Sequence, residues 1–151
     1  MNLLGNLHGI FVSKGGVPKL PITECSIDNL GIVVDKQQNP KYHGGPERAI
    51  CILDLDILLK LQKEGHPISP GSTGENLLIS GCKLSIGEKI SVGNVELEIV
   101  SAASPCYKIA DSFIDGNFNR FSDKLNPGDT RWYCRVLNGG DIKISSEVDN
   151  L

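Results

Sequence analysis

The amino-acid sequence predicts a mainly β fold with a few short helices, in a single domain that spans residues 1–151. Many short runs are rich in Val and Ile and are bounded by Gly, Pro, Asn or Asp, which is typical of β-strands. Only one segment has the periodicity of an amphipathic helix. A chain of this length can bury its own core, and no linker or repeat divides it. The pattern indicates a barrel or a sandwich, and periodicity does not choose between them.

The strands are predicted where β-branched residues form short runs between turn residues. The alternation is cleanest from Val95 to Ile99, where apolar residues alternate with two glutamates. The pairs Gly93-Asn94 and Gly139-Gly140 predict tight hairpins, so neighbouring strands are expected to be antiparallel. In chain order, the predicted strands are Gly9 to Ser13, Gly31 to Asp35, Ala49 to Leu53, Asn76 to Ile79, Lys89 to Val92, Val95 to Val100, Arg131 to Leu137 and Asp141 to Ile144.

One amphipathic helix is predicted from Leu55 to Glu64. Asp54 can cap its first turn, and Gly65 can adopt the left-handed conformation that follows a helix end. The leucines expected on its buried face are Leu55, Leu58 and Leu59.

Charge and composition narrow the class of partner. The chain has 15 Lys and Arg against 18 Asp and Glu, a formal net charge of −3, and no basic block interleaved with aromatic residues. This argues against nucleic-acid binding and favours a small-molecule partner. The N-terminus has no cationic segment followed by an apolar one, and no apolar run approaches the ~18 residues of a membrane span. We therefore expect a cytoplasmic protein with no membrane partner.

Cys106 stands out among the five cysteines. They contain no C-x-x-C pair and are odd in number, so reduced thiols are expected instead of a zinc knuckle or a disulfide framework. A short helix is predicted to begin at Ser104, with Pro105 in its first position and Cys106 in its second. Unpaired N–H groups at such a helix start stabilise a thiolate, which can ligate a soft metal or attack an electrophile. The alternative, in which Cys106 only fills a buried gap, stays open at this stage.

Three loops combine flexible backbone with functional side chains. The turn His43-Gly44-Gly45 can present an imidazole and backbone N–H groups to an anion or a flat ring, or can be a plain surface turn. The segment Ser13-Lys14-Gly15-Gly16 can form a phosphate nest, although it lacks the full P-loop pattern. Gly74-Glu75-Asn76 places a carboxylate and an amide before a strand, where they can bind the edge of a heterocycle or close a turn.

Arg131, Tyr133 and Arg135 alternate along one predicted strand and therefore share a face. Two guanidinium groups on that face could converge on an anion. Ordinary solvated arginines are the alternative.

The chain resembles the MOSC domain family, named for the C-terminal part of molybdenum-cofactor sulfurases, in four segments that occur in the family's order: KYHGGPERAICILD, EGHPISPGSTGENLLISG, VELEIVSAASPCYKI and RWYCRVLNGGDIKI. The likeness runs from Lys14 to Val148. It is closest to the stand-alone bacterial type, which reduces N-hydroxylated bases and related compounds. The resemblance implies a mixed, closed β-barrel with a few short helices, similar to the barrel domain of pyruvate kinase.

The resemblance also implies a site. Cys106 would bind molybdenum, and the molybdenum cofactor, a molybdopterin, would perform the two-electron chemistry. His43-Gly44-Gly45 and Gly74-Glu75-Asn76 would line the pterin and substrate pocket, and His43 or Glu75 would protonate the leaving hydroxyl of the substrate. The residues expected to hold the cofactor and its phosphate are Lys14, Tyr133, and Arg131 or Arg135.

Two departures from the family's pattern bear on these roles. Ala102 and Ala103 stand where many relatives have an arginine before the Pro-Cys pair, so Arg131 or Arg135 would supply that anion contact. Ser145-Ser146-Glu147 replaces a terminal Gly-Asp turn. The chain ends before any redox domain, so a reductase would need a separate electron-donor protein. The oligomeric state, including a homodimer, is left open.

Three functions are consistent with these residues. The leading one is a molybdenum-cofactor-dependent oxidoreductase that reduces N-hydroxylated small molecules. The second is a cofactor or sulfur carrier, or a sulfurtransferase, that uses a Cys106 persulfide. The third is a hydrolase or transferase in which His43 activates Cys106 as a nucleophile, and it ranks last because the sequence has no oxyanion-hole signature.

Overall fold

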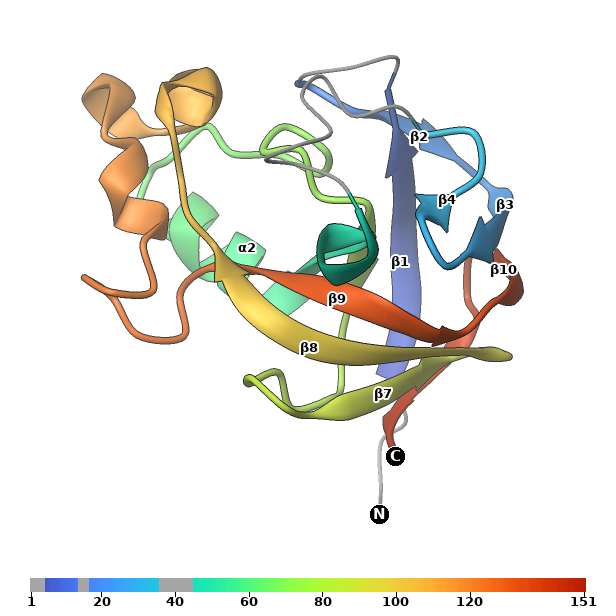
Figure 1. Cartoon of the computed structure of the whole chain (residues 1–151). Helices are drawn as coiled ribbons and strands as arrows, with labels where there is room; N and C mark the ends of the chain where they lie inside the picture. Colours follow the sequence, from blue (N-terminus) through green and yellow to red (C-terminus); the bar gives the residue numbers. More distant parts are fainter. Residues whose placement is uncertain (1–4, 14–16, 36–44) are drawn as a thin grey trace.

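A closed β-barrel forms the body of the molecule (Figure 1). The computed structural model describes residues 5–13, 17–35 and 45–151. Within these residues, seven strands run in the order β11-β7-β8-β9-β5-β6-β1, and β11 also pairs with β1, which closes the barrel. The parallel pair β5 and β6 makes the barrel mixed. The fold expected from the family resemblance is therefore confirmed.

The barrel strands are short and are bounded by turns. They are β1 (Gly5–Val12), β5 (Ile50–Asp54), β6 (Leu77–Ile79), β7 (Lys89–Val92), β8 (Val95–Ala103), β9 (Arg131–Asn138) and β11 (Glu147–Asn150). A further strand, β2 (Leu20–Ile22), pairs with β1 outside the closed ring. The hairpin predicted at Gly93-Asn94 is confirmed, because β7 and β8 pair directly around it and Gly93 has φ +56°.

A small second sheet corrects the other predicted hairpin. Its strands are β3 (Glu24–Asp28), β4 (Gly31–Ile32) and β10 (Gly140–Lys143), and β10 pairs with β3 instead of with β9. Gly139 is needed for close approach, because a Cβ there would lie 2.4 Å from the carbonyl oxygen of Ile27. The two glycines therefore carry the chain from the barrel into the second sheet.

The strand predicted from Gly31 to Asp35 is also shorter than expected. Gly31 and Ile32 pair with β3, and Val33 N–H donates one further hydrogen bond to Ser26 O at 3.0 Å. Val33 and Val34 form an exposed turn. A run of β-branched residues favours extended backbone, but without a partner strand it does not make a ladder.

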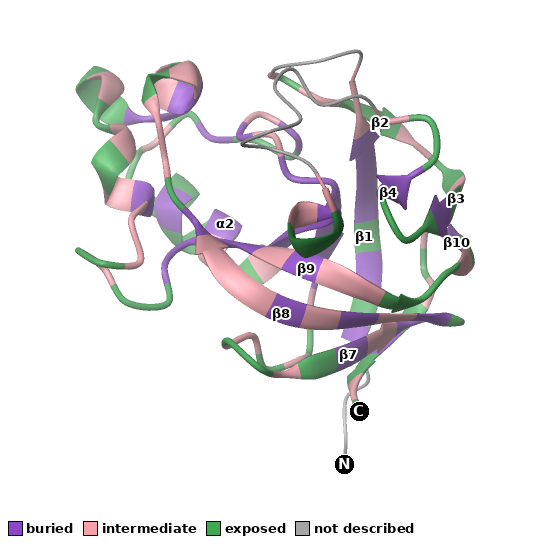
Figure 2. Cartoon of the chain, in the orientation of Figure 1, coloured by how far each residue is buried: buried purple, intermediate pink, exposed green. Residues whose placement is uncertain are grey.

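The barrel interior is filled by aliphatic side chains that alternate along each strand. On β8, Val95, Leu97 and Ile99 are buried, whereas Glu96 and Glu98 point outward, as the sequence pattern predicts. Figure 2 shows buried residues alternating with partly exposed ones along the first half of β8, and with exposed ones along the first half of β1. The largest members of this core are Leu7, Ile10, Ile50, Ile52, Leu77, Ile79, Ile90, Leu97, Ile99 and Trp132.

A second apolar cluster covers part of the barrel's outer wall. It joins outward residues of β1, β5 and β6 to α2 (Leu55–Lys63) and to the short 3-10 helices η2 (Tyr107–Ser112) and η4 (Phe118–Phe121). Between the last two lies η3 (Ile114–Gly116), whose first N–H donates to Nδ1 of His66. These helices therefore pack on one side of the barrel. In the described part of the chain, no helix is long and apolar enough to span a membrane.

The helix α2 has the predicted ends. The Asp54 carboxylate accepts a hydrogen bond from the N–H of Asp56 at 2.9 Å. At the other end the N–H groups of Gly65 and His66 donate to the carbonyls of Gln62 and Leu61, which is a Schellman motif. One predicted buried residue is wrong, because Leu58 and Leu61 are buried but Leu59 is 51% exposed.

The helix predicted to begin at Ser104 is different from the prediction. The segment from Ser104 to Cys106 is not helical, and Cys106 is the N-cap residue of η2, with φ −139° and ψ 172°. Ser104 directly precedes Pro105, and a proline disfavours helical backbone in the residue before it. Cys106 is therefore outside the helical turns.

The orientation of α2 gives a direct stability prediction. Leu61→Ala should lower the free energy of unfolding by about 2–5 kcal/mol, because it removes a fully buried side chain. Leu59→Ala, on the exposed face, should have much less effect. Urea denaturation of both variants measures the difference, and equal losses would contradict this placement of the helix.

Candidate functional site

The paired strands β5 and β9 form one side of the candidate site, and we call their outer face the wall. Cys51 lies opposite Tyr133. The neighbours of these two residues, among them Ile52 and Cys134, point into the barrel core, so Cys51 and Tyr133 point outward. Arg131 is two residues before Tyr133 on the same face, and it pairs with Ala103 at the end of β8. The outer wall thus gathers these groups beside the segment that leads to Cys106.

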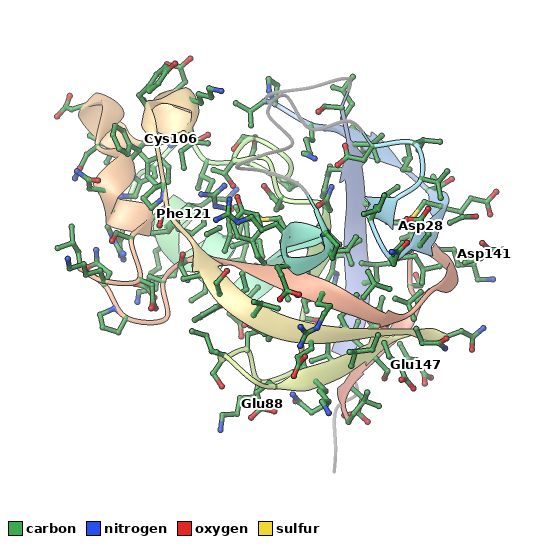
Figure 3. The ribbon with its side chains drawn as sticks, viewed as in Figure 1. Asp28, Glu88, Cys106, Phe121, Asp141 and Glu147 are labelled. Carbon is green, nitrogen blue, oxygen red and sulfur yellow. The ribbon has the colours of Figure 1, made fainter. Side chains whose placement is uncertain are left out.

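Cys106 lies at the edge of this wall. The side chain is half-buried, and its thiol is close enough to Tyr133 to act electrostatically on the phenol. Figure 3 shows Cys106 at the start of η2, on the same side of the barrel as Phe121. The predicted stabilisation by an α-helix start does not apply, because η2 is a six-residue 3-10 helix and Cys106 supplies a carbonyl to Ile109 N–H at 3.1 Å. Cys106 is partly exposed, so it is not the fully buried cysteine of the alternative interpretation.

The four other thiols are kept protonated. Burial raises the pKa of Cys25 and of Cys51 to about 11 and the pKa of Cys82 to about 12. Burial also raises the pKa of Cys134 well above that of a free thiol. A thiolate is therefore disfavoured at each of these positions.

Tyr133 is a neutral hydrogen-bonding group at the centre of the wall. Burial raises the pKa of its phenol to about 12, and the nearby Cys51 acts in the same direction. The guanidinium carbon of Arg48 lies 5.6 Å from the ring centre, a cation–π arrangement. At physiological pH the hydroxyl therefore keeps its proton and can donate it in a hydrogen bond.

Arg131 is a buried cation held by backbone carbonyls. It is 7% exposed, and its Nη1 and Nη2 donate to the carbonyl oxygens of Thr73 at 2.6 Å and Ala103 at 3.4 Å. The guanidinium carbon lies 5.3 Å from the ring centre of Phe121. Among the described residues, Nε of Arg131 has no hydrogen-bond partner. A buried guanidinium with spare donors favours an anion beside it.

Arg135 does not join Arg131, so the expected convergence of two guanidinium groups is wrong. Arg135 is four residues farther along β9, roughly 13 Å away at the usual strand rise. Its Nη1 pairs with Glu47 at 3.0 Å, and its Nη2 pairs with Glu98. Both partners are carboxylates on the exposed outer face. Arg135 therefore pins the segment before β5 to the barrel wall instead of facing Cys106.

Glu75 braces the loop that precedes β6. It is completely buried, and its two carboxylate oxygens accept hydrogen bonds from Gly71 N–H and the Thr73 hydroxyl, each at 2.8 Å. The carbonyl of Thr73 is also the acceptor for Arg131. Glu75 and Arg131 are thus joined through one residue, which fixes the loop against the start of β9.

Asn76 connects three parts of the fold. Its side-chain oxygen accepts a hydrogen bond from Cys51 N–H at 2.9 Å, and its amide donates to the Asp35 carboxylate at 2.9 Å. Asp35 in turn accepts from Lys19 Nζ at 2.5 Å and from Ser13 N–H at 2.8 Å. Asn76 is therefore a buried structural link next to the wall, with no exposed amide edge.

The glycine-rich turn before η1 (Pro46–Arg48) is only partly described. His43, Gly44 and Lys14 lie outside the described residues, so their predicted roles stay predictions. Gly45 has φ +89°, a conformation that favours glycine, and open space lies where its Cβ would be. The helix η1 itself lies on β9, held by Glu47 and Arg48 as described above.

Sequence reasoning missed several members of this neighbourhood. Arg48 follows the predicted His43-Gly44-Gly45 turn, and Cys51 lies in the predicted strand from Ala49 to Leu53. The sequence pattern indicates no separate role for either residue. Asp35 is the last residue of the strand predicted from Gly31 to Asp35, so its buried carboxylate is not predicted. An Asp that ends an apolar run is nevertheless a usable signal of a polar contact. The missed residues are Lys19, Asp35, Arg48, Cys51 and Thr73.

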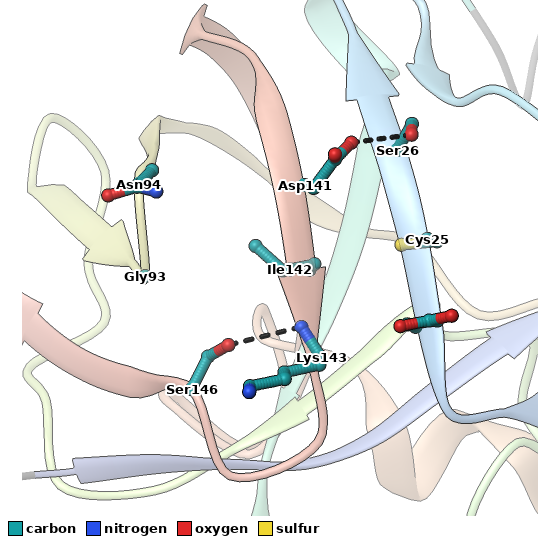
Figure 4. Close-up of a pocket in the computed structure, with 9 residues that line it drawn as sticks. Cys25, Ser26, Gly93, Asn94, Asp141, Ile142, Lys143 and Ser146 are labelled. Carbon is teal, nitrogen blue, oxygen red and sulfur yellow. Dashed lines mark hydrogen bonds between the residues drawn. The ribbon is translucent and has the colours of Figure 1, made fainter.

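Two other features of the described residues bear on ligand binding. No group of three or more His, Cys, Asp or Glu side chains there could hold a metal ion by itself. A cavity of about 440 Å³ lies between β3, β10 and the turn after β7 (Figure 4). Its walls include Cys25, Asn94, Asp141 and Lys143, and none of the predicted site residues that the structure describes lines it.

The raised pKa values of four of the five thiols predict the order in which the cysteines are alkylated. Limiting iodoacetamide at neutral pH should modify Cys106 before the other cysteines, because burial keeps those four thiols protonated. Peptide mass spectrometry measures the order, with Cys106→Ser as the control that should lose the early adduct. First labelling at Cys25 or Cys82 would contradict the assignment.

The phenol makes a prediction for alkaline pH. The contribution of Tyr133 to the free energy of unfolding should be complete below pH 10, the ordinary pKa of a tyrosine. It should be lost between pH 10 and 12, because in that range the phenol ionises only in the unfolded chain. The loss is on the order of 2 kcal/mol. Urea denaturation across this range should show a shallower decline in Tyr133→Phe than in the wild type. Tyr107→Phe, at an exposed position, is the control and should follow the wild type.

Comparison with known proteins agrees with this architecture. The MOSC domain sequence pattern matches residues 39–149. YiiM of Escherichia coli K12 is 25% identical over an alignment of 133 positions that covers 83% of this chain and 58% of that protein, so the chain spans less than two thirds of this relative.

Solved structures show the same fold at low sequence identity. YiiM from Geobacillus stearothermophilus has a TM-score of 0.73 at 20% identity, covering 97% of this chain and 75% of that one. YuaD from Bacillus subtilis has a TM-score of 0.71 at 16% identity, covering 97% and 94%. The family match extends over well more than half of the sequence and ends within β11. The chain therefore belongs to the MOSC domain family, which is associated with binding of the molybdenum cofactor.

Proposed function

We propose that this protein binds the molybdenum cofactor through Cys106 and reduces N-hydroxylated small molecules. The observation that carries the proposal is the position of Cys106, a half-buried thiol beside a wall with a neutral phenol and a buried guanidinium. Family membership supports the choice of cofactor.

The described residues fit such a group. A thiolate is a suitable ligand for molybdenum, and the cofactor's own dithiolene and oxo groups complete its coordination, so one protein ligand suffices. Arg131, whose Nε–H has no partner in the described part of the chain, and Tyr133, with a retained proton, offer donors to anionic oxygens.

The remaining roles follow from the contacts on the wall. Tyr133 would orient substrate or cofactor by donating a hydrogen bond, and Arg131 would supply positive charge. His43 is the proposed proton donor, because both oxygens of Glu75 already accept hydrogen bonds within their loop. Lys14, Gly44 and Gly45 remain proposed cofactor contacts, whereas Asn76 is proposed to position Cys51 by accepting the hydrogen bond from its N–H.

The reaction breaks the N–O bond of a hydroxylamine. Two electrons and two protons convert the substrate into an amine and water, and the bound cofactor would pass on the two electrons. A separate electron-donor protein is proposed as their source. The chain's residues would hold the substrate, exclude water and deliver a proton to the leaving oxygen.

Metal content tests the proposal. Wild-type protein from a molybdenum-replete host should contain close to stoichiometric molybdenum by mass spectrometry of the metal, and Cys106→Ser should lose most of it while keeping its circular dichroism. Cys25→Ser, a half-buried cysteine outside the wall, is the matched control and should keep the metal.

Two outcomes would contradict the proposal. A folded, metal-free wild type from that host would exclude stable cofactor binding. A metal-free protein with an additional sulfur atom on Cys106 would instead support the carrier function, since a half-buried thiol is accessible for sulfur transfer.

A further inference from the structure

A buried carboxylate joins three parts of the chain that lie far apart in the sequence. The side chain of Asp35 has no exposed surface, and that of Lys19 is 10% exposed. Asp35 Oδ1 accepts from Ser13 N–H, and Oδ2 accepts from both Lys19 Nζ and the Asn76 amide. We call Ser13, Lys19, Asp35 and Asn76 the Asp35 cluster.

The Asp35 cluster is joined directly to the wall of the site. Besides binding Asp35, the Asn76 amide donates to Phe11 O at 3.3 Å, and its side-chain oxygen accepts from Cys51 N–H. Cys51 is opposite Tyr133 in the barrel. One side chain therefore separates the Asp35 carboxylate from the strand that carries the site.

The cluster also lies at two points where the chain leaves a sheet, because Ser13 follows β1 of the barrel and Asp35 comes after β4 of the second sheet. Ser13 and Lys19 are the residues on either side of the segment that contains Lys14-Gly15-Gly16. Asp35 directly precedes the segment that contains His43-Gly44. Three hydrogen bonds to one carboxylate thus set where both segments start relative to β5.

Stability alone is a poor reason for such a cluster. Replacing a buried ion pair by apolar residues of similar size is often neutral or stabilising, because the pair must be taken out of water. A buried pair does specify geometry, since each charge must be matched in one arrangement. The Asp35 cluster lies at two points where the chain leaves a sheet, so the geometry that it specifies can position the backbone at both points.

We propose that Asp35 is a positioning residue that sets the exit points of the segments 14–16 and 36–44 relative to the wall with Tyr133 and Cys106. Its consequence for cofactor retention rests on the proposed function. Asp35 touches neither substrate nor cofactor in this proposal and acts through Ser13, Lys19 and Asn76.

The test removes the charges in pairs. Asp35→Asn alone leaves Lys19 buried without a counter-ion and can unfold the protein, so the informative variant is Lys19→Met with Asp35→Asn. The matched control is Lys83→Met with Glu88→Gln, a pair at 3.7 Å with Lys83 75% exposed. Hydrogen–deuterium exchange, thermal midpoint and molybdenum content are measured for all three proteins, including the wild type.

The expected result separates positioning from general stability. In the Lys19/Asp35 variant, exchange should accelerate in peptides covering residues 13–19 and 35–45 and stay unchanged in β5 and β9. Molybdenum retention should fall by about tenfold, as for other residues that orient a metal site indirectly. The Lys83/Glu88 control should match the wild type in both measurements.

Other outcomes would overturn the inference. Unchanged exchange in both segments would show that Asp35 does not position them. Faster exchange throughout β5 and β9, with a lower thermal midpoint, would show a merely structural role. If the wild type contains no molybdenum, the proposed function fails, whereas the exchange pattern still decides whether Asp35 positions the segments.

Discussion

The register of β5 against β9 is the constraint on which the site depends. Side chains alternate between the two faces of a strand, so a slip by one residue would turn every side chain of β9 to the other face. Trp132 and Cys134 would leave the core, and Arg131 and Tyr133 would enter it. The cost of that exchange fixes the register. The hydrophobic core of the barrel thereby determines which polar groups face Cys106.

The polar groups next to the wall can be buried because they form hydrogen bonds, mainly with backbone groups. Arg131 donates to two carbonyls, Glu75 accepts from a main-chain N–H and a hydroxyl, and Asn76 binds backbone on two strands. Each contact offsets part of the cost of leaving water. The same low polarity raises the pKa of Tyr133 and Cys51 and so keeps both neutral. The wall therefore presents the Tyr133 hydroxyl and the Arg131 guanidinium as hydrogen-bond donors.

Family membership and geometry contribute different parts of the functional argument. The MOSC match associates the chain with the molybdenum cofactor, and it identifies no ligand or reaction. The structure brings Cys106, Arg131 and Tyr133 to one side of the barrel and places Arg135 elsewhere. Cys106 as the metal ligand, with Arg131 in place of the arginine that many relatives have before the Pro-Cys pair, is the proposal that joins the two parts.

The sequence by itself determined the local features of this protein. The caps of α2, the turn at Gly93-Asn94 and the alternation from Val95 to Ile99 depend on residues close together in the chain, whose conformational preferences act before any tertiary contact. The tertiary structure decided the rest. Gly139-Gly140 leads into a second sheet, and Asp35 binds Asn76 across 41 positions of the chain. Strand pairing and buried polar contacts join distant residues, and their free energies depend on what the whole fold buries.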